Sequence, residues 1–197
     1  MSDNSNFFAM MARMKHVNRW GLMRNTLNES IAEHTLDVIM LSHALIVIAN
    51  TYFGKNLDGG RACLLAAYHD APEIMTGDMP TPVKYLNQEI KNAYKNVEEK
   101  VIETMVDSLP LEMQGTYDSI FNGKEEGDEE LFKFVKAADK LSALIKCIDE
   151  EQMGNKDFAS AKDSTLRIIK EMKMPELEYF IDHFLPGYYM TLDEQTK

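Results

Sequence analysis

The sequence predicts an all-α protein folded as a helical bundle. Apolar residues recur at three- and four-residue steps through almost the whole chain, which is the spacing of one face of an α-helix. No stretch of useful length shows strand-like alternation, and no internal repeat or low-complexity segment is present. A chain of 197 residues can build one full core and leaves little room for two, so we expect a single domain over residues 1–197.

Two helices are expected within the first 50 residues. Ser30, three positions before Glu33, forms a capping box, so a helix should start at about Ile31. Apolar residues on almost every side predict that this helix is buried at the centre. An earlier amphipathic helix loses its pattern near Trp20-Gly21 and is marked by apolar residues at helical steps, namely Phe7, Met11, Met14 and Val17.

The rest of the chain also shows helical periodicity. A third helix should follow a glycine turn, and a long amphipathic helix should end at Pro110. An acidic loop over residues 122–130 leads into another buried helix, and two shorter helices follow. These helices are expected at about residues 58–70, 82–109, 130–151, 160–172 and 176–185.

The composition argues against several classes of partner. The net charge of −11 repels nucleic-acid backbones and acidic membrane surfaces, so neither is an expected partner. The same charge repels phosphorylated small molecules. A phosphate substrate would therefore need a local cation, either a metal ion or an arginine such as Arg19.

The sequence also bears on the cellular compartment. The N-terminal segment carries Asp3 and lacks the apolar core of a signal peptide, and no uninterrupted apolar stretch approaches the length of a membrane span. Cys63 and Cys147 lie in helical, apolar surroundings and are expected to be two reduced core thiols. We therefore expect a cytoplasmic protein.

The segment "AAYHDAPEIMTGDMPTPVKY" ends an apolar run with several titratable groups. His69 and Asp70 are followed one turn later by Glu73, so the three side chains can face one cleft. Pro72 should kink or restart the helix, which lets neighbouring side chains converge. The same residues also fit a capping box with Asp70 as the N-cap, and for this segment alone both interpretations stay open.

Two other helices each add one residue of a metal-binding type. His34 lies one turn into its helix among apolar residues, and Asp139 lies in "VKAADKLSALI", whose small residues allow another helix to approach. Alone, such a His is more often a hydrogen-bonded core residue, and such an Asp can pair with a lysine. With His69 and Asp70 they give the order H…HD…D, whose two imidazoles and two carboxylates suit a divalent ion such as Mn, Co, Ni, Fe or Zn.

H…HD…D on an all-α bundle resembles the HD-domain superfamily of metal-dependent phosphohydrolases. The blocks "NRWGLMRN", "AEHT", "YHDAPEIMTGDMPTPVKY" and "KAADKLSA" are similar to the YfbR-type 5′-deoxynucleotidases, from about Phe7 to Leu192. The resemblance implies an HD-domain helical bundle that hydrolyses 2′-deoxyribonucleoside 5′-monophosphates to deoxynucleoside and phosphate. It also implies one divalent metal ion (Co, Mn or another transition metal) and a homodimer.

The resemblance and the residue chemistry agree on the central roles. Glu73 would handle a proton on the attacking water or on the leaving 5′-oxygen, and Arg19 would hold the phosphate. The metal ion would activate the water and neutralise charge on the phosphoryl oxygens. Its ligands would be His34, His69, Asp70 and Asp139.

Further roles follow from the resemblance alone. Trp20 would lie against the sugar, where an added 2′-hydroxyl would clash, and Asp78 would contact the nucleoside or a water network. The substrate loop would consist of Asp78, Met79, Pro80 and Thr81. Each residue also has an ordinary interpretation, because Arg19 can cap a helix or pair with an acid, Trp20 can be core, and Asp78 can be a turn residue.

Other function classes fit less well. A binuclear HD phosphodiesterase needs additional His ligands, but His43 lies about half a turn round the helix from His34, and His16 and His183 lack ligand-type neighbours. The chain is also short for a triphosphohydrolase of this superfamily. Three alternatives stay open: a non-catalytic HD module that binds or senses nucleotides, an HD phosphohydrolase acting on another nucleotide, and a purely structural bundle.

Overall fold

The computed structural model describes residues 4–84 and 86–197, and every regular element in these ranges is a helix. The all-α prediction is therefore confirmed. The α-helices are α1 (Phe7–Met11), α2 (Ile31–Tyr52), α3 (Gly59–Tyr68), α4 (Glu73–Thr76), α5 (Thr81–Lys84), α6 (Gln88–Asp107), α7 (Leu111–Asn122), α8 (Asp128–Gln152), α9 (Ala159–Glu171), α10 (Pro175–His183) and α11 (Leu192–Gln195). Three 3₁₀ segments cover Ala12–His16, Lys156–Phe158 and Leu185–Tyr189.

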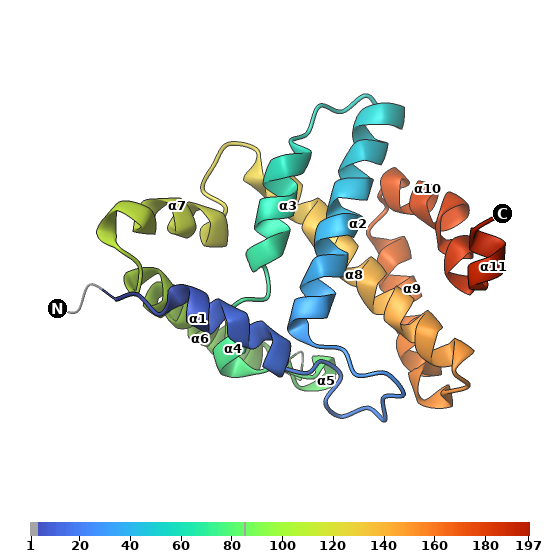
Figure 1. The fold of residues 1–197 in the computed structure, drawn as a ribbon, viewed down its shortest axis with the longest axis horizontal. Helices are drawn as coiled ribbons and strands as arrows, with labels where there is room; N and C mark the ends of the chain where they lie inside the picture. The colour runs from blue at the N-terminus through green and yellow to red at the C-terminus, as the bar shows by residue number, and fades with distance from the viewer. Residues whose placement is uncertain (1–3, 85) are drawn as a thin grey trace.

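Helices α2 and α8 cross at the centre of the molecule, and α3 lies beside α2 (Figure 1). Their facing residues form the main hydrophobic core, which α9 and α10 extend. On α8, Ala138 is fully buried, and its small side chain allows the close approach that the sequence predicts. A second core packs Phe7 of α1 against α6 and the turn after α3. The crossing brings the first turns of α2 next to the middle of α8, where the site lies.

Helix α2 begins at Ile31, as the capping box predicts. Ser30 N donates to Glu33 Oε2 at 2.7 Å, and Glu33 N donates to Ser30 Oγ at 3.3 Å. The bonds from Ser30 lower the pKa of Glu33 and hold its carboxylate in the charged form. The start of α2 is therefore fixed by local chemistry, and with it the position of the next helical turn.

Helix α2 lies at the centre and packs against α3 and α8, as predicted, but one of its apolar faces is exposed. Leu36, Met40 and Val47 are 57%, 55% and 46% exposed. Helix α2 has 22 residues and a mean hydropathy of 1.6, so by length and composition it could cross a membrane. No stretch of the sequence was expected to be long and apolar enough for this. Half of the 18-residue stretch with this hydropathy is buried inside the protein, where α2 packs against α3 and α8. Its apolar character is therefore partly that of a core helix.

The structure divides two of the expected helices. Segment 82–109 becomes the end of α5 and all of α6, because Asn87 caps α6 by accepting a hydrogen bond from Ile90 N at 2.8 Å. Residue 85 lies outside the described residues. The first expected helix changes from α to 3₁₀ geometry after Met11. Helices α7 and α11 were not expected, whereas α3, α8, α9 and α10 confirm the remaining predictions to within a few residues.

Both cysteines are free thiols, as predicted. Cys147 is buried on α8, and burial raises the pKa of its thiol to about 11. Cys63 on α3 is partly buried, and burial also raises its pKa. Both groups are therefore poor nucleophiles at neutral pH.

Candidate metal centre and active site

His34 lies on the second turn of α2 and is completely buried. Its Nε2 atom is 3.2 Å from Asp139 Oδ1 on α8 and 3.4 Å from Asp70 Oδ2. Neither contact has the direction of a hydrogen bond, so this Nε2 has no hydrogen-bond partner among the described residues. On the opposite side of the ring, Nδ1 is 2.9 Å from Ser142 Oγ.

His69 and Asp70 lie in the turn that links α3 to α4. His69 Nδ1–H donates to Ala66 O at 2.7 Å, so in the neutral ring the lone pair is on Nε2, which is 3.2 Å from Asp70 Oδ2. Helix α4 begins at Glu73, and no side chain caps it. The capping-box interpretation of Asp70 is therefore wrong, because its carboxylate faces the two imidazoles.

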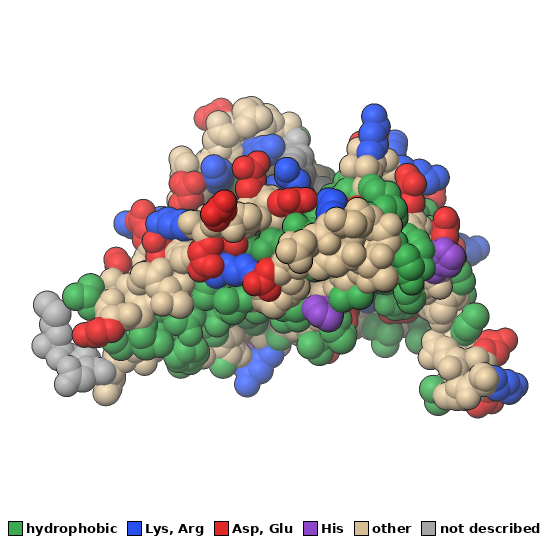
Figure 2. Space-filling view, turned by 90° about the horizontal axis from the view of Figure 1, so that it is seen from above, with side chains coloured by type: hydrophobic (Ala, Val, Ile, Leu, Met, Phe, Trp, Pro, Cys, Tyr) green, Lys and Arg blue, Asp and Glu red, His purple; other side chains and the backbone are tan. Residues whose placement is uncertain are grey.

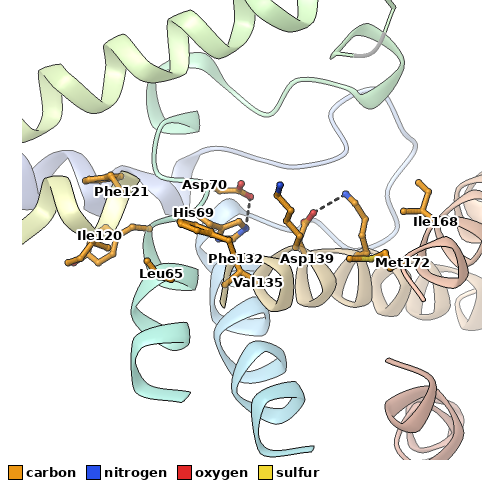
Figure 3. A pocket seen from close by; sticks show the side chains of 13 residues that line it. Leu65, His69, Asp70, Ile120, Phe121, Phe132, Val135, Asp139, Ile168 and Met172 are labelled. Atoms are coloured by element: carbon orange, nitrogen blue, oxygen red, sulfur yellow. Dashed lines mark hydrogen bonds and ion pairs between the residues drawn. The ribbon is translucent and has the colours of Figure 1, made fainter. Parts of the chain in front are cut away.

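Asp139 approaches the same point from α8. Its Oδ1 atom faces His34, while Oδ2 accepts a hydrogen bond from Lys140 Nζ at 2.9 Å. Figure 3 shows His69 and Asp70 next to each other, with Asp139 facing them from α8. The structure thus brings together all four side chains of the H…HD…D pattern, from three separate segments of the chain.

The arrangement fits a divalent cation. One ligand atom each from His34, His69 and Asp70 lie within 4.8 Å of one another. Asp139 is not part of that group, but its Oδ1 is 3.2 Å from His34 Nε2. The buried Nε2 atoms of both histidines lack a hydrogen-bond partner among the described residues. Unsatisfied buried nitrogens are costly in a protein interior, and a metal ion would satisfy both.

The electrostatics of the cluster keep both aspartates ionised. Burial would raise the pKa of Asp70, but the facing imidazoles of His69 and His34 outweigh it and hold that pKa far below its usual range. The pKa of Asp139 is likewise lowered, because His34 and Lys140 overcome the effect of burial. Burial lowers the pKa of His69, yet Asp70 and Asp139 raise it to about 9. The His69 ring therefore carries a proton on both nitrogens at neutral pH, and a bound divalent ion would displace the one on Nε2.

A pocket of about 470 Å³ opens onto this cluster (Figure 3). His69, Asp70 and Asp139 line it on one side. The remaining lining residues are mostly apolar and come from α3, α7, α8 and α9: Leu65, Tyr68, Ile120, Phe121, Phe132, Val135, Lys136, Lys140, Ile168 and Met172. His69, Asp70 and Asp139 can therefore be reached from solvent, whereas His34 does not line the pocket.

Glu73 is the first residue of α4 and is buried. Its Oε2 atom has no hydrogen-bond partner among the described residues. Burial, together with the negative charges of Asp70 and Asp78, raises the pKa of Glu73 to about 9. A carboxyl group with such a displaced pKa next to a metal-type cluster is suited to holding or moving a proton.

Arg19 lies behind the cluster, with its side chain mostly buried. Its Nη1 atom is 3.2 Å from both carboxylate oxygens of Glu29 and 2.8 Å from His34 Nδ1, and its Nη2 atom is 3.9 Å from Asp139 Oδ1. Burial lowers the pKa of Arg19, but the charges of Glu29 and Asp139 outweigh this and raise it. The guanidinium is therefore a fixed positive charge beside the cluster, and it does not cap a helix.

Trp20 and Asp78 contact each other across the site. Trp20 N donates to Asp78 Oδ2 at 2.9 Å, and the indole Nε1–H donates to Glu29 Oε2 at 2.8 Å. Trp20 is partly exposed, so it is not an ordinary core residue. Met79 and Pro80 follow Asp78 at intermediate burial, and Thr81 begins α5, although its side chain lies outside the described part of the structure.

Two polar residues of the site were missed by sequence reasoning. Glu29 joins Arg19 to Trp20, and Ser142 contacts His34 from one turn beyond Asp139. Only the capping motif marks the neighbourhood of Glu29, and Ser142 resembles any small residue on a buried helix. His16, His43 and His183 are exposed, and none belongs to the cluster.

Comparison with known proteins agrees with this geometry. Residues 6–188 match the family model of the YfbR-like 5′-deoxynucleotidases. The 5′-deoxynucleotidase YfbR of Shigella boydii is 42% identical over 190 residues, which cover 96% of this chain and 95% of that protein. YfbR of Escherichia coli O1:K1 gives the same identity and coverage.

Solved structures support the fold. An HD-domain phosphohydrolase from Listeria innocua superposes with a TM-score of 0.79 at 22% identity, over 98% of this chain and 92% of that one. An HD phosphohydrolase of cyanophage S-2L, bound to dA and one catalytic Zn²⁺ ion, superposes with a TM-score of 0.67 at 20% identity, over 93% and 96% of the two chains. The fold is that of the HD phosphohydrolases, and the chain belongs to the YfbR-like 5′-deoxynucleotidase family.

Proposed function

We propose that the protein is a metal-dependent phosphomonoesterase that hydrolyses 2′-deoxyribonucleoside 5′-monophosphates to deoxynucleoside and phosphate. The observation that carries the proposal is the convergence of His34, His69, Asp70 and Asp139, with both imidazole Nε2 atoms lacking a hydrogen-bond partner in the described chain. The 5′-deoxynucleotidases that are 42% identical over nearly the whole chain support the choice of substrate.

In this proposal the two imidazole Nε2 atoms and one oxygen each from Asp70 and Asp139 hold a single divalent cation. Mixed nitrogen and oxygen ligands suit a borderline transition metal, and we propose Co²⁺ or Mn²⁺ as the activating ion. When bound, the ion supplies Lewis-acid chemistry, since it lowers the pKa of a water molecule from about 16 towards 7 and offsets phosphoryl charge. Proton transfer and positioning are left to the protein's own side chains.

Glu73 is proposed to carry the proton. It is close enough to Asp70 and Asp78 for their charges to raise its pKa, so it holds a proton near neutral pH. It would donate that proton to the leaving 5′-oxygen, and the carboxylate so formed would take a proton from the attacking water. This group is buried, which limits proton exchange with bulk solvent.

Arg19 and Trp20 are proposed to hold the substrate. Arg19 Nη2 points toward the metal side of Asp139, where it can bind a phosphoryl oxygen and offset the net charge of −11. Trp20 would lie against the deoxyribose and leave no room for a 2′-hydroxyl. Asp78, which accepts the Trp20 backbone N–H, would contact the nucleoside side of the site, together with Met79, Pro80 and Thr81.

A homodimer is proposed on the exposed apolar face of α2. Leu36, Met40 and Val47 are spaced by four and seven residues, so they lie along one stripe of the helix. Figure 2 shows hydrophobic side chains gathered along one edge of the molecule, away from most of the charged ones. A single-sided apolar patch of this kind favours self-association in water. Light scattering on Met40→Lys would give a monomer if the stripe is the interface.

The remaining proposals concern the cellular compartment of the protein and its binding partners. We propose a cytoplasmic location with no nucleic-acid or membrane partner, supported by the free thiols and the negative net charge. Salt-dependent binding to DNA or to anionic vesicles would contradict this part.

A screen of phosphate release tests the proposed function. Deoxyribo- and ribonucleoside monophosphates are compared with Co²⁺, Mn²⁺, Zn²⁺ or a chelator, using wild type and Asp139→Ala. The proposal expects metal-dependent release from the deoxyribonucleotides, lost in the variant. Nucleotide binding without turnover would favour a sensing module, and turnover only of other nucleotides would favour a different substrate.

A further inference from the structure

Glu29 connects the two residues proposed to hold the substrate. Its two carboxylate oxygens are both 3.2 Å from Arg19 Nη1, and Oε2 also accepts the Trp20 indole N–H at 2.8 Å. Its backbone carbonyl accepts a hydrogen bond from Arg19 N at 2.8 Å. The side chain is buried, at 11% exposure, so these charge-assisted bonds are little screened by water.

Arg19 Nη1 also contacts His34 Nδ1, and this contact would change if the cluster held a metal ion. His34 Nδ1 lies 2.8 Å from Nη1 and can accept a hydrogen bond only if it carries no proton. Binding a metal through Nε2 requires the proton to be on Nδ1, where Ser142 Oγ can accept it. Arg19 is a donor only, so Glu29 would then be the remaining acceptor for Nη1.

The backbone at Trp20 shows that its position is imposed by its surroundings. Its φ angle of 60° lies in the left-handed region, which is unfavourable for a residue with a side chain. Asp78 holds the Trp20 N–H, and Glu29 holds the indole N–H. The ring lies 5.3 Å from that of Phe158, and the Arg19 guanidinium is 5.8 Å from the indole centroid. Without Glu29, the indole N–H would lose its hydrogen bond, and the ring would keep only its contacts with Phe158 and the Arg19 guanidinium.

From these contacts we infer that Glu29 is a positioning residue that fixes Arg19 and Trp20 relative to each other and so sets the preference for deoxyribose over ribose. The inference rests on the proposed function, because it concerns how that same site reads the sugar. Glu29 is not one of the proposed metal ligands, and its carboxylate contacts Arg19 and Trp20. Its carboxylate holds the phosphate-binding side chain and the sugar-facing side chain at a constant separation.

The test uses three variants of the full chain. Glu29→Ala removes both acceptors, and Glu29→Gln keeps one amide oxygen for the indole N–H but loses the charge. Asp37→Asn is the matched control, since it removes a half-buried negative charge that interacts with Glu29 and accepts no hydrogen bond from Arg19 or Trp20. Each is assayed with dAMP and AMP, and acrylamide quenching is measured on Trp20, the only tryptophan in the chain.

The expected result is a fall of about tenfold in the ratio of kcat/KM for dAMP over AMP in Glu29→Ala. Glu29→Gln recovers part of the ratio, and Asp37→Asn keeps it. Quenching of Trp20 rises in Glu29→Ala. The ratio is informative because partial unfolding lowers activity toward dAMP and AMP equally, so its effect cancels from the ratio. If Glu29→Ala does not fold, Glu29→Gln carries the test, with an intermediate ratio expected.

An unchanged ratio in the folded variants, or a Trp20 that is quenched as in wild type, overturns the inference. A wild-type protein inactive on every nucleotide is a different outcome. It overturns the proposed function and with it the sugar preference, while quenching still shows whether Glu29 holds the indole.

Discussion

His34 on α2 and Asp139 on α8 meet where the two helices cross, with Nε2 and Oδ1 3.2 Å apart. His34 is completely buried, and the ring has no freedom to move away without opening the main core. The crossing therefore does more than build the core, because it fixes the separation of two proposed metal ligands.

Ser142 should support metal binding through His34. Its hydroxyl is the acceptor for the Nδ1–H that His34 must carry when Nε2 binds a metal. Ser142→Ala should weaken the affinity for Co²⁺ by about 10- to 100-fold in a competition titration with a chelator. The control is Ser42→Ala, another buried serine of the core, whose hydroxyl has no partner among the described residues and whose loss should leave affinity unchanged. Equal affinities in both variants would contradict the role.

Glu73 should matter for turnover and not for metal binding. Glu73→Gln keeps the shape of the side chain but can no longer accept a proton, so kcat should fall by about 10²-fold or more. Metal affinity should stay near the wild-type value, because Glu73 is not a proposed ligand. Glu112→Gln, at an exposed position on α7, serves as the control. A Glu73→Gln enzyme with wild-type kcat would show that the proton travels by another group.

Glu73 should also destabilise the metal-free protein at neutral pH. The pKa of Glu73 is about 9 in the folded protein and 4.5 in an unfolded chain. Unfolding therefore becomes more favourable as pH rises from about 4.5 to 9. The metal-free Glu73→Gln protein should therefore be more stable than wild type at pH 7, by about 3 kcal/mol. The difference should vanish below pH 4.5. Urea unfolding in the presence of a chelator measures it, and a less stable variant at pH 7 would contradict the prediction.

Glu150 should stabilise the segment that leads to Glu29. It accepts hydrogen bonds from the Thr26 and Leu27 backbone and pairs with the buried Lys146. Glu150→Ala leaves that lysine without its charge partner, and should cost about 3–5 kcal/mol of unfolding free energy. Removing both charges in Glu150→Gln with Lys146→Met should cost less.

The same carboxylate gives a pH signature. Burial raises the pKa of Glu150, but its bonds to Lys146 and Asn155 outweigh this and lower it to about 2. Its contribution to stability is therefore present above about pH 4.5 and is lost as pH falls toward 2. Guanidinium unfolding of wild type should show this loss, and Glu150→Gln should lack it. A variant with the wild-type acid dependence would contradict the assignment.

Local signals in the sequence predicted much of the fold. The start of α2 depends on two residues three positions apart, so Ser30 and Glu33 determine it wherever the helix packs. The division between α5 and α6 was missed because the helical spacing of apolar residues continues through it, whereas the Asn87 cap overrides that spacing. The exposed face of α2 could not be read from apolar residues alone, since core and surface contacts favour the same residue types.

The candidate site was also predicted only in part from the sequence. His34, His69, Asp70 and Asp139 were selected by residue type and order, and the fold brings them together, although their roles as ligands stay predictions. Glu29 and Ser142 could not be found this way. Glu29 acts through a carboxylate like those of many other acids in the chain, and Ser142 acts through a hydroxyl that meets His34 only after α2 and α8 have crossed.

The most direct test of the account is a crystal structure of the protein loaded with Co²⁺, with the ion located by its anomalous scattering. One peak is expected per chain, about 2.0–2.2 Å from the Nε2 atoms of His34 and His69 and from one oxygen each of Asp70 and Asp139. A peak that lies elsewhere, or one that lacks His34 or Asp139 among its ligands, would contradict the central claim.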